Sequence, residues 1–233
     1  MAIFARGPEP GKAKTRLWPL LGREGAAAFQ AALIGDALRK VTSIGSITRY
    51  LFVLANSPLG FGIGSQGRAR NHKCTLAWQQ GTDLGERLER AFHRMLCCHR
   101  RVLVIGTDSP ELTPRGLRQA LDELRWCDGV LGPCPDGGYY LIGLRRLERG
   151  LFPGVRWGTS LAFQDTLRNL VKCHFSCSVL EPLLDIDRPA DFRRLAKRLS
   201  LSSQLRRLAP ATWSFVNRLE SAYVRSPEIR FGP

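Results

Sequence analysis

The sequence lacks a long apolar run and any C-x-x-C pair, and each absence disfavours a class of protein. No apolar segment approaches the length that crosses a membrane, and the start from Met1 to Arg6 is too short for a signal peptide. The seven cysteines are an odd number without zinc-finger spacing, which disfavours a disulfide framework and a structural zinc site. We therefore expect a cytoplasmic protein without a membrane partner.

Two nucleotide-binding signatures are also missing. No G-x-G-x-x-G follows the first apolar run, which disfavours a dinucleotide-dependent dehydrogenase. In the loop after that run, only three residues separate Gly7 from the Gly11-Lys12 pair, and Ala13 stands where a Walker A loop needs Ser or Thr. ATPase chemistry of the P-loop kind is therefore disfavoured.

Acidic residues are few, since 20 Asp and Glu stand against 35 Lys and Arg and give a formal net charge of +15. Nucleic acid, an anionic membrane surface and a phosphorylated small molecule all suit such a surplus. Aromatic and basic residues are not interleaved as in recognised RNA-binding modules, so nucleic acid is the less favoured partner. A noncatalytic nucleotide- or RNA-binding protein stays open as an alternative.

Short β-rich runs alternate with helical stretches along the 233 residues. We expect strands at 2–5, 50–55, 74–79, 102–106, 129–132 and 139–144, helices at 24–41, 85–99 and 114–126, and a surface loop at 56–71. This alternation predicts an α/β fold in which a mostly parallel sheet forms the middle layer of a three-layer α/β/α sandwich.

The chain is expected to divide into a domain at 1–199 and a basic helical extension at 200–233 that packs on it. Residues Trp213, Phe215, Val216, Leu219 and Tyr223 could form the apolar stripe of a terminal helix. The basic charges of the extension are typical of solvated helix faces, which predicts that it is dispensable for ligand binding. The alternative is that its apolar residues cover the core.

The loop at 6–16 follows a predicted strand and precedes a helix, which is where α/β folds bind phosphate. If the loop is locally extended, Lys12, Lys14 and Arg16 point to one side and form a cationic row for a diphosphate. A solvated basic turn is the simpler interpretation, but two glycines, two prolines and alternating cations favour phosphate binding.

Carboxylates occur at two further points. Asp108 ends the apolar strand at 102–106, where it could bind Mg²⁺ or Mn²⁺ or merely cap a turn before Pro110. Asp185 and Asp187 lie on one face of an extended segment, with Ile186 directed into the sheet. Asp187 could instead cap a helix that begins at Arg188.

A glycine-rich turn at 135–140 separates two predicted strands. Its simplest interpretation is a hairpin connection. Its functional interpretation is a backbone that approaches a ligand closely.

Taken in order, eight motifs resemble a known family. They lie at 4–6, 10–11, 14–17, 80–87, 106–110, 136–140, 157–160 and 185–187. It is the transferase family associated with radical-SAM and selenodomain gene neighbourhoods, also described as arsenosugar-biosynthesis glycosyltransferases. The resemblance spans about residues 2–195. This family is similar to the GT-A nucleotide-diphospho-sugar transferases, which implies a Rossmann-like mixed sheet, and more distantly to 2-phospholactate guanylyltransferases.

The resemblance also implies roles. The donor and its phosphates would contact Arg6, Gly7, Gly11, Lys12, Lys14, Thr15, Arg16, Gln79, Gly85 and Arg87. The acceptor would contact Asp136, Gly137, Gly138, Tyr139, Trp157, Thr159 and Ser160. Asp108, with Asp185 or Asp187, would hold Mg²⁺ or Mn²⁺, and Asp108 and Lys14 are the expected catalytic residues.

We therefore expect a metal-dependent glycosyl transfer from a nucleotide sugar to a small-molecule acceptor. The alternative is nucleotidyl transfer, in which the same groups hold a nucleoside triphosphate and pyrophosphate leaves.

Overall fold

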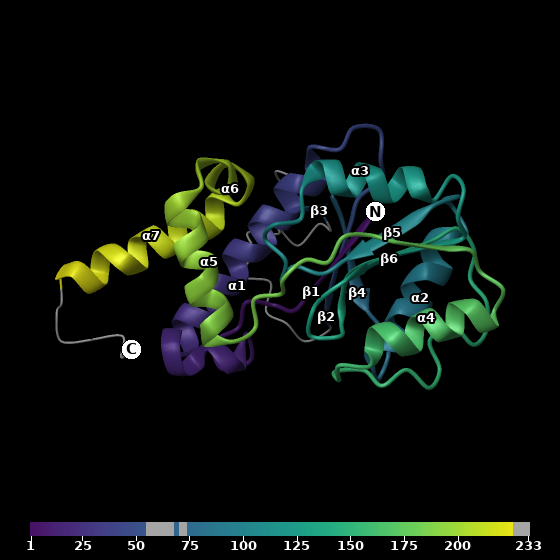
Figure 1. Ribbon diagram of the computed structural model, residues 1–233, viewed down its shortest axis with the longest axis horizontal. Coiled ribbons are helices and arrows are strands. Elements are labelled where there is room, and N and C mark those ends of the chain that lie inside the picture. The colour runs from purple at the N-terminus through teal and green to yellow at the C-terminus, as the bar shows by residue number, and fades with distance from the viewer. Residues whose placement is uncertain (55–67, 70–73, 226–233) are drawn as a thin grey trace.

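The computed structural model describes residues 1–54, 68–69 and 74–225, which are organised around an eight-stranded sheet (Figure 1). The strand order is β3-β4-β2-β1-β5-β7-β6-β8. The strands are β1 (Ala2–Ala5), β2 (Tyr50–Leu54), β3 (Arg68–Ala69), β4 (Cys74–Gln79), β5 (Val102–Ile105), β6 (Gly129–Pro133), β7 (Tyr139–Leu144) and β8 (Cys177–Val179).

Most of these strands run in one direction. The four central strands β4, β2, β1 and β5 are mutually parallel, while β3 and β7 run against their neighbours. Strands β6 and β7 form a hairpin, so the simpler interpretation of the turn at 135–140 is confirmed. The predicted mostly parallel, mixed sheet is also confirmed.

Helices cover both faces of the sheet. They are α1 (Trp18–Thr42), α2 (Leu84–Leu96), α3 (Pro114–Glu123), α4 (Ala162–Lys172), α5 (Pro189–Leu201), α6 (Ser203–Leu208) and α7 (Pro210–Arg225), with a 3₁₀ turn η1 (Thr15–Leu17) before α1.

The alternation of side chains along β1 shows how the layers form. Ile3 packs with α1 and α3 on one face, whereas Ala2 packs with α2 and α4 on the other. The predicted three-layer α/β/α sandwich is therefore confirmed.

A second helical core lies on the side of α1 that faces away from the sheet, where α5, α6 and α7 gather (Figure 1). Phe29 of α1 contacts Phe192 of α5 and Phe215 of α7, with ring centroids 5.1 and 5.5 Å apart. Val216 of α7 is also buried in this cluster. The alternative interpretation, in which the apolar residues of the extension cover a core, is therefore confirmed, and its dispensability for ligand binding stays a prediction.

Removing the extension would expose much of that core. Leu205, Phe215 and Val216 are all buried, and burial of each such side chain stabilises by about 1.5–3 kcal/mol. The predicted boundary at 199 also falls inside α5, which continues to Leu201. The side chain of Tyr223, which was expected in the apolar stripe, lies outside the described residues.

Several elements differ from the sequence expectation. Helix α1 begins six residues earlier than the predicted 24, with helical geometry interrupted at Gly22. Helix α4 and strand β8 were not predicted. Most of the loop predicted at 56–71 lies outside the described residues, and its part Arg68–Ala69 is a strand that pairs with β4.

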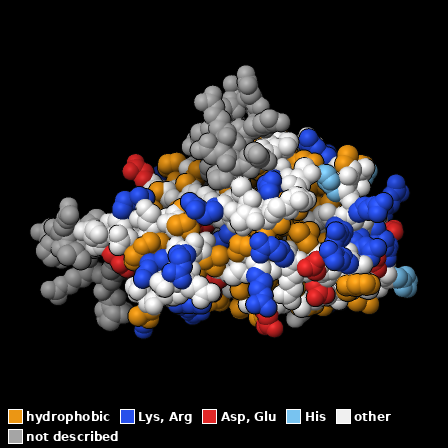
Figure 2. All heavy atoms as spheres, turned by 90° about the horizontal axis from the view of Figure 1, so that it is seen from above, with side chains coloured by type: hydrophobic (Ala, Val, Ile, Leu, Met, Phe, Trp, Pro, Cys, Tyr) orange, Lys and Arg blue, Asp and Glu red, His pale blue; other side chains and the backbone are white. Residues whose placement is uncertain are grey.

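The basic surplus is distributed over the surface. Figure 2 shows Lys and Arg side chains along the whole length of one face, interspersed with other residue types. None of the described helices has the length and apolar character needed to cross a membrane.

Candidate active site

A cleft of about 940 Å³ opens at the carboxyl edge of the sheet. Its lining includes Ala5, Leu54, Gln79 and Gly106, which end or follow the four parallel strands β1, β2, β4 and β5. In open α/β sheets, ligands bind outside the carboxyl ends of the strands. The cleft therefore lies where the fold places a substrate.

The structure brings most of the predicted site residues into this cleft. Its lining includes Arg6, Lys12, Lys14, Thr15, Arg16, Gln79, Arg87, Asp108, Asp136, Gly138, Tyr139, Trp157, Thr159, Ser160, Asp185 and Asp187. Four predicted glycines, Gly7, Gly11, Gly85 and Gly137, are not part of that lining. The individual ligand roles stay predictions.

The loop at 6–16 is a series of turns and is not extended. The amides of Lys12 and Ala13 both donate to the carbonyl of Glu9, and Lys14 has a left-handed φ of 44°. The expected cationic row at period two does not form, because Lys12 pairs with Glu9 whereas Lys14 and Arg16 both contact Asp187. Lys12 is 71% exposed and pairs with Glu9, whereas the Lys14 side chain is only 5% exposed.

Lys14 lies between two carboxylates. Its Nζ is 3.0 Å from Oδ1 of Asp108 and 2.8 Å from Oδ1 of Asp187, and it donates to the carbonyl of Ile186 at 2.7 Å. Burial opposes the charge, but Asp108 and Asp187 hold the pKa of Lys14 above its usual value. The ammonium is thus committed to protein acceptors and does not point at an open phosphate site.

The three aspartates have different environments. Burial opposes ionisation of Asp187, yet Lys14, followed by Arg16, holds its pKa below the ordinary range. Asp185 bonds to the hydroxyl of Ser109, and burial together with the neighbouring Asp108 raises its pKa to about 6. Asp108 and Asp187 are therefore the carboxylates that share a cation.

The sequence predicts a divalent metal ion beside Asp108, and the side chains there provide only part of a metal site. Carboxylate oxygens are suitable ligands for Mg²⁺ or Mn²⁺. Among the described residues, however, no three carboxylate, thiol or imidazole groups converge on one point that could hold a metal ion. The reason is local, since Lys14 stands between Asp108 and Asp187 while Asp185 is bonded to Ser109.

Asp108 is held by a chain of hydrogen bonds from α1. Gln30 donates through Nε2 to the hydroxyl of Thr107 at 3.1 Å, and Thr107 donates to Oδ1 of Asp108 at 3.0 Å. The amide of Ile186 donates to the carbonyl of Asp108 at 2.9 Å. These contacts fix the strand-end loop against both α1 and the segment that carries Asp187.

The structure corrects two expectations for the segment at 185–187. Asp187 does not cap α5, because the cap is formed by Asp191, whose Oδ2 accepts from the amide of Arg188 at 2.9 Å. Ile186 does not point into the sheet but is buried in the helical core beside Leu17 and Phe29. The Asp187 side chain is thus directed to Lys14 and Arg16.

Gln79, which lines the cleft at the end of β4, links this strand to β1 and β2. Its Nε2 donates to the carbonyls of Ala5 and Phe52 at 3.1 and 3.0 Å. An amide nitrogen has two protons, so both donors are used and only Oε1 is left for a ligand. The segment after Gln79 is ordered by Glu86, which accepts from the amide and hydroxyl of Thr82.

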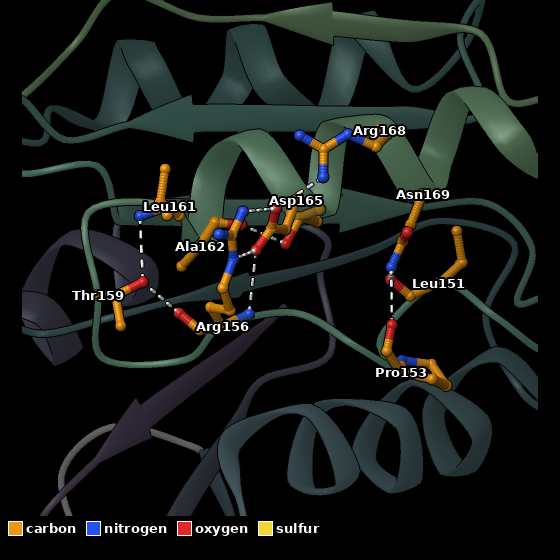
Figure 3. Close-up of polar contacts among 10 residues, drawn as sticks. Leu151, Pro153, Arg156, Thr159, Leu161, Ala162, Asp165, Arg168 and Asn169 are labelled. Atoms are coloured by element: carbon orange, nitrogen blue, oxygen red, sulfur yellow. Dashed lines mark hydrogen bonds and ion pairs between the residues drawn. The ribbon is translucent and has the colours of Figure 1, made fainter.

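The predicted acceptor side is a loop that α4 holds in place (Figure 3). Arg156 donates through Nε and Nη2 to Asp165, both at 2.8 Å, and Arg168 donates to the same carboxylate at 2.9 Å. The Arg156 guanidinium holds the pKa of the buried Asp165 well below its usual range. Thr159 in turn donates to the carbonyl of Arg156 at 2.7 Å.

Two glycines let this loop approach its neighbours. A Cβ at Gly85, in the first turn of α2, would lie 2.6 Å from Nε1 of Trp157. A Cβ at Gly137, which has a φ of 87°, would collide with the carbonyl oxygen of Ser160 at 1.9 Å. Both glycines therefore act through packing rather than by lining the cleft.

Several residues that line the cleft were not predicted from the sequence, including Gln30, Arg188, Asp191 and Arg194. Gln30 carries a weak signal, because it is a polar residue among the mostly apolar buried positions of the helix at 24–41, as are Asp36 and Lys40. The two arginines carry none, since they begin an ordinary basic helix.

The family DUF2064, described as "Uncharacterized protein conserved in bacteria", matches residues 37–159, which is more than half of the chain. The chain belongs to this family. The match includes Asp108 and the acceptor-side loop through Thr159, whereas Lys14 and Asp187 lie outside it. No curated protein matches the sequence.

Solved structures share the fold. A protein from Desulfovibrio desulfuricans G20, provisionally described as a nucleotide-diphospho-sugar transferase, is 30% identical with a TM-score of 0.82, over 98% of this chain and 97% of its own. The GT-A-like fold expected from the sequence agrees with this relative.

Two more distant structures are similar in fold. One is CMP:2-keto-3-deoxy-manno-octonic acid synthetase in complex with CTP, at 12% identity and a TM-score of 0.52, over 86% of this chain and 97% of its own. The other is 4-diphosphocytidyl-2C-methyl-D-erythritol synthase from Anaerococcus prevotii DSM 20548, at 10% identity and a TM-score of 0.53, over 82% and 91%. At such identities the likeness shows the fold alone.

Proposed function

We propose that this DUF2064 protein transfers a glycosyl group from a nucleotide sugar to a small-molecule acceptor. The observation that carries the proposal is the group of Lys14, Asp108 and Asp187 at the strand ends, inside a cleft that also presents Arg6 and Arg16. The description of the 30% identical relative supports it. The resemblance of the motifs to the arsenosugar-biosynthesis branch suggests the finer assignment and a cytoplasmic setting.

The chemistry needs no covalent nucleophile. As the acceptor hydroxyl attacks the anomeric carbon, the bond to the nucleoside diphosphate breaks and negative charge grows on the departing phosphate. Arg16, whose side chain is 61% exposed, and Arg6 are placed to bind that charge. Asp108 and Asp187 would hold the divalent cation, which would supply further charge neutralisation.

The acceptor would enter between the 135–140 turn and the loop at 157–160. Trp157 and Tyr139 form an edge-to-face pair with centroids 6.2 Å apart, and both line the cleft. Such an aromatic wall can exclude water from the reacting centre and can pack on a sugar or another flat ligand.

Nucleotidyl transfer is the second candidate, because two fold neighbours with TM-scores above 0.5 have names that refer to cytidine nucleotides. In that reaction an acceptor oxygen attacks the α-phosphorus of a nucleoside triphosphate, and pyrophosphate leaves. The same cations would bind the leaving group.

A product assay distinguishes the two reactions. The protein is first screened by thermal shift with nucleotides and nucleotide sugars, because a ligand that binds the folded state raises the apparent stability. Ligands that bind are then incubated with Mn²⁺ and candidate acceptors. Nucleoside diphosphate release supports glycosyl transfer, and pyrophosphate release supports nucleotidyl transfer.

Arg16→Ala provides the matched variant and should weaken donor binding about tenfold, which is typical of one lost charge-assisted contact. Arg23→Ala is the control, because Arg23 stacks on Trp18 and is not part of the cleft lining. Steeply salt-dependent RNA binding without any nucleotide binding would contradict both transferase proposals.

A further inference from the structure

The ammonium of Lys14 has three donors, and each has a protein acceptor. The acceptors are Oδ1 of Asp108, Oδ1 of Asp187 and the carbonyl of Ile186, at 3.0, 2.8 and 2.7 Å. An ammonium group offers no fourth proton. In this arrangement Lys14 cannot also bind a donor phosphate, although it lines the cleft.

The same two carboxylate oxygens are the ones that a divalent cation would need. Mg²⁺ binds carboxylate oxygens at about 2.0–2.1 Å, closer than an ammonium does. Because Nζ of Lys14 contacts both oxygens directly, it occupies the space between them. A cation bridging Asp108 and Asp187 and an ammonium bridging the same pair therefore exclude each other.

We propose that Lys14 is a built-in counter-cation that leaves Asp108 and Asp187 when a divalent cation binds, and then turns toward the donor phosphates. This inference rests on the proposed function, since it explains how one lysine can serve both the resting site and the nucleotide complex.

The electrostatic reason for such an exchange is the closeness of two like charges. Asp108 and Asp187 both contact the same Nζ, so their carboxylates repel each other when no cation lies between them, although each side chain is 37% exposed. Lys14 supplies one positive charge in the free protein, and a divalent cation replaces it with two. The exchange therefore never leaves Asp108 and Asp187 without a counter-charge.

Lys14 has an uncommon backbone conformation. Lys14 lies between the turn that ends at Ala13 and the start of η1, with a φ of 44° that is unusual for a residue with a side chain. Non-glycine residues in this region cost of order 1–3 kcal/mol and occur at switch sites. Its flexible four-carbon stem reaches the cleft without moving the sheet.

Mn²⁺ binding, measured by calorimetry and by electron paramagnetic resonance without any nucleotide, tests the competition. Lys14→Met should bind Mn²⁺ at least about tenfold more tightly than the wild type, because the apparent affinity is lowered by the fraction of molecules in which Lys14 holds the site. Lys172→Met is the control and should leave Mn²⁺ affinity unchanged, since Lys172 is exposed in the last turn of α4 and is not part of the cleft lining. Equal or weaker Mn²⁺ binding by Lys14→Met overturns the proposal.

Acylation of the wild-type protein gives a second measurement that does not depend on the variant folding. The Lys14 side chain is 5% exposed and the Lys12 side chain is 71% exposed, so a small acylating reagent should label Lys12 first. Saturating Mn²⁺ should raise Lys14 labelling severalfold relative to Lys12, as judged by peptide mass spectrometry. Unchanged or reduced Lys14 labelling overturns the proposal.

Failure of this inference is distinguishable from failure of the proposed function. If Mn²⁺ binds neither the wild type nor Lys14→Met, the exchange is wrong, and nucleotide binding and product formation still decide the transferase assignment. If nucleotides bind but Lys14 stays protected with Mn²⁺, the function stands and Lys14 is a fixed structural cation.

Discussion

The carboxylate of Asp36 in α1 accepts a hydrogen bond from the amide of Thr212 in α7 at 2.9 Å, across 176 residues of sequence. Its other oxygen accepts from the amide of Ala211 at the same distance. Both amides lie in the first turn of α7 and have no intrahelical partner. Asp36 is therefore the N-terminal cap of a helix at the far end of the chain.

Asp36→Ala should lower the free energy of unfolding by about 1–3 kcal/mol, because it removes a cap and leaves buried amides without an acceptor. Urea denaturation followed by circular dichroism measures the loss. Glu220→Ala, an exposed substitution in the same helix, is the control and should change little. An unchanged midpoint for Asp36→Ala would show that the cap contributes nothing.

Lys40→Met should remove a pH dependence of stability. Burial lowers the pKa of Lys40 to about 8 while its Nζ donates to the carbonyl of Pro110. Between about pH 8 and the unfolded pKa of about 10.4, only the unfolded chain keeps the Lys40 proton, so the free energy of unfolding rises with pH. Below that window both states are protonated, and the buried charge lowers the free energy of unfolding.

The difference in unfolding free energy between wild type and Lys40→Met should therefore shift by roughly 2 kcal/mol between pH 7 and pH 10, with the variant relatively more stable at pH 7. Urea midpoints at both pH values measure this. Lys172→Met, at an exposed position in the last turn of α4, should show no such shift.

Asp108→Asn and Asp187→Asn should each reduce metal-dependent turnover about a hundredfold or more, because the amide keeps the shape and loses the charge. Asp191→Asn is the control from the same cleft, since Asp191 is the third residue of α5 and the side-chain oxygen of Asn can still accept from the amide of Arg188. Mn²⁺ titrations beside turnover measure both effects. Full Mn²⁺ response in Asp108→Asn would leave a cation-only phosphate site as the better account.

Asp165→Asn should loosen the loop at 155–161, because it removes the charged acceptor of Arg156. Hydrogen exchange of that loop should accelerate, and the KM for the acceptor should rise more than the KM for the donor. Asp122→Asn, which alters an exposed surface pair, should change neither.

Protonation of Asp165 at low pH should loosen the same loop in the wild type. The pKa of Asp165 is depressed, so its contribution to stability is present above the unfolded pKa of about 4 and is lost as pH falls through the lower folded value. The loop should therefore stay protected from exchange down to strongly acidic pH. Loss of protection already near pH 5 would contradict this.

The sequence was sufficient for six of the eight described strands and for the strand-end residues of the cleft. Asp108 and Gln79 follow apolar runs, and parallel strands bring such positions to one edge. It was not sufficient for the partner of Lys14, because Asp187 lies 173 residues away and no local pattern joins them. The turns at 9–14 also separate Lys12, which pairs with Glu9, from Lys14 and Arg16, which contact Asp187.

Helix α4 was missed for a physical reason. Ala162, Thr166 and Leu170 repeat at helical spacing on its buried face, but the buried Asp165 interrupts the apolar pattern. A buried aspartate is destabilising unless a charged partner compensates it, and here the partner is Arg156 from the preceding loop. Sequence periodicity does not show such a partner.

The second helical core also sets an order of events during synthesis. Phe29 emerges from the ribosome long before Phe192 and Phe215, with which it packs. Contacts of such sequence separation carry a loop-closure cost and form late. The outer apolar face of α1 therefore stays uncovered until α7 has been translated, and transiently exposed apolar surface of this kind favours aggregation of a nascent chain.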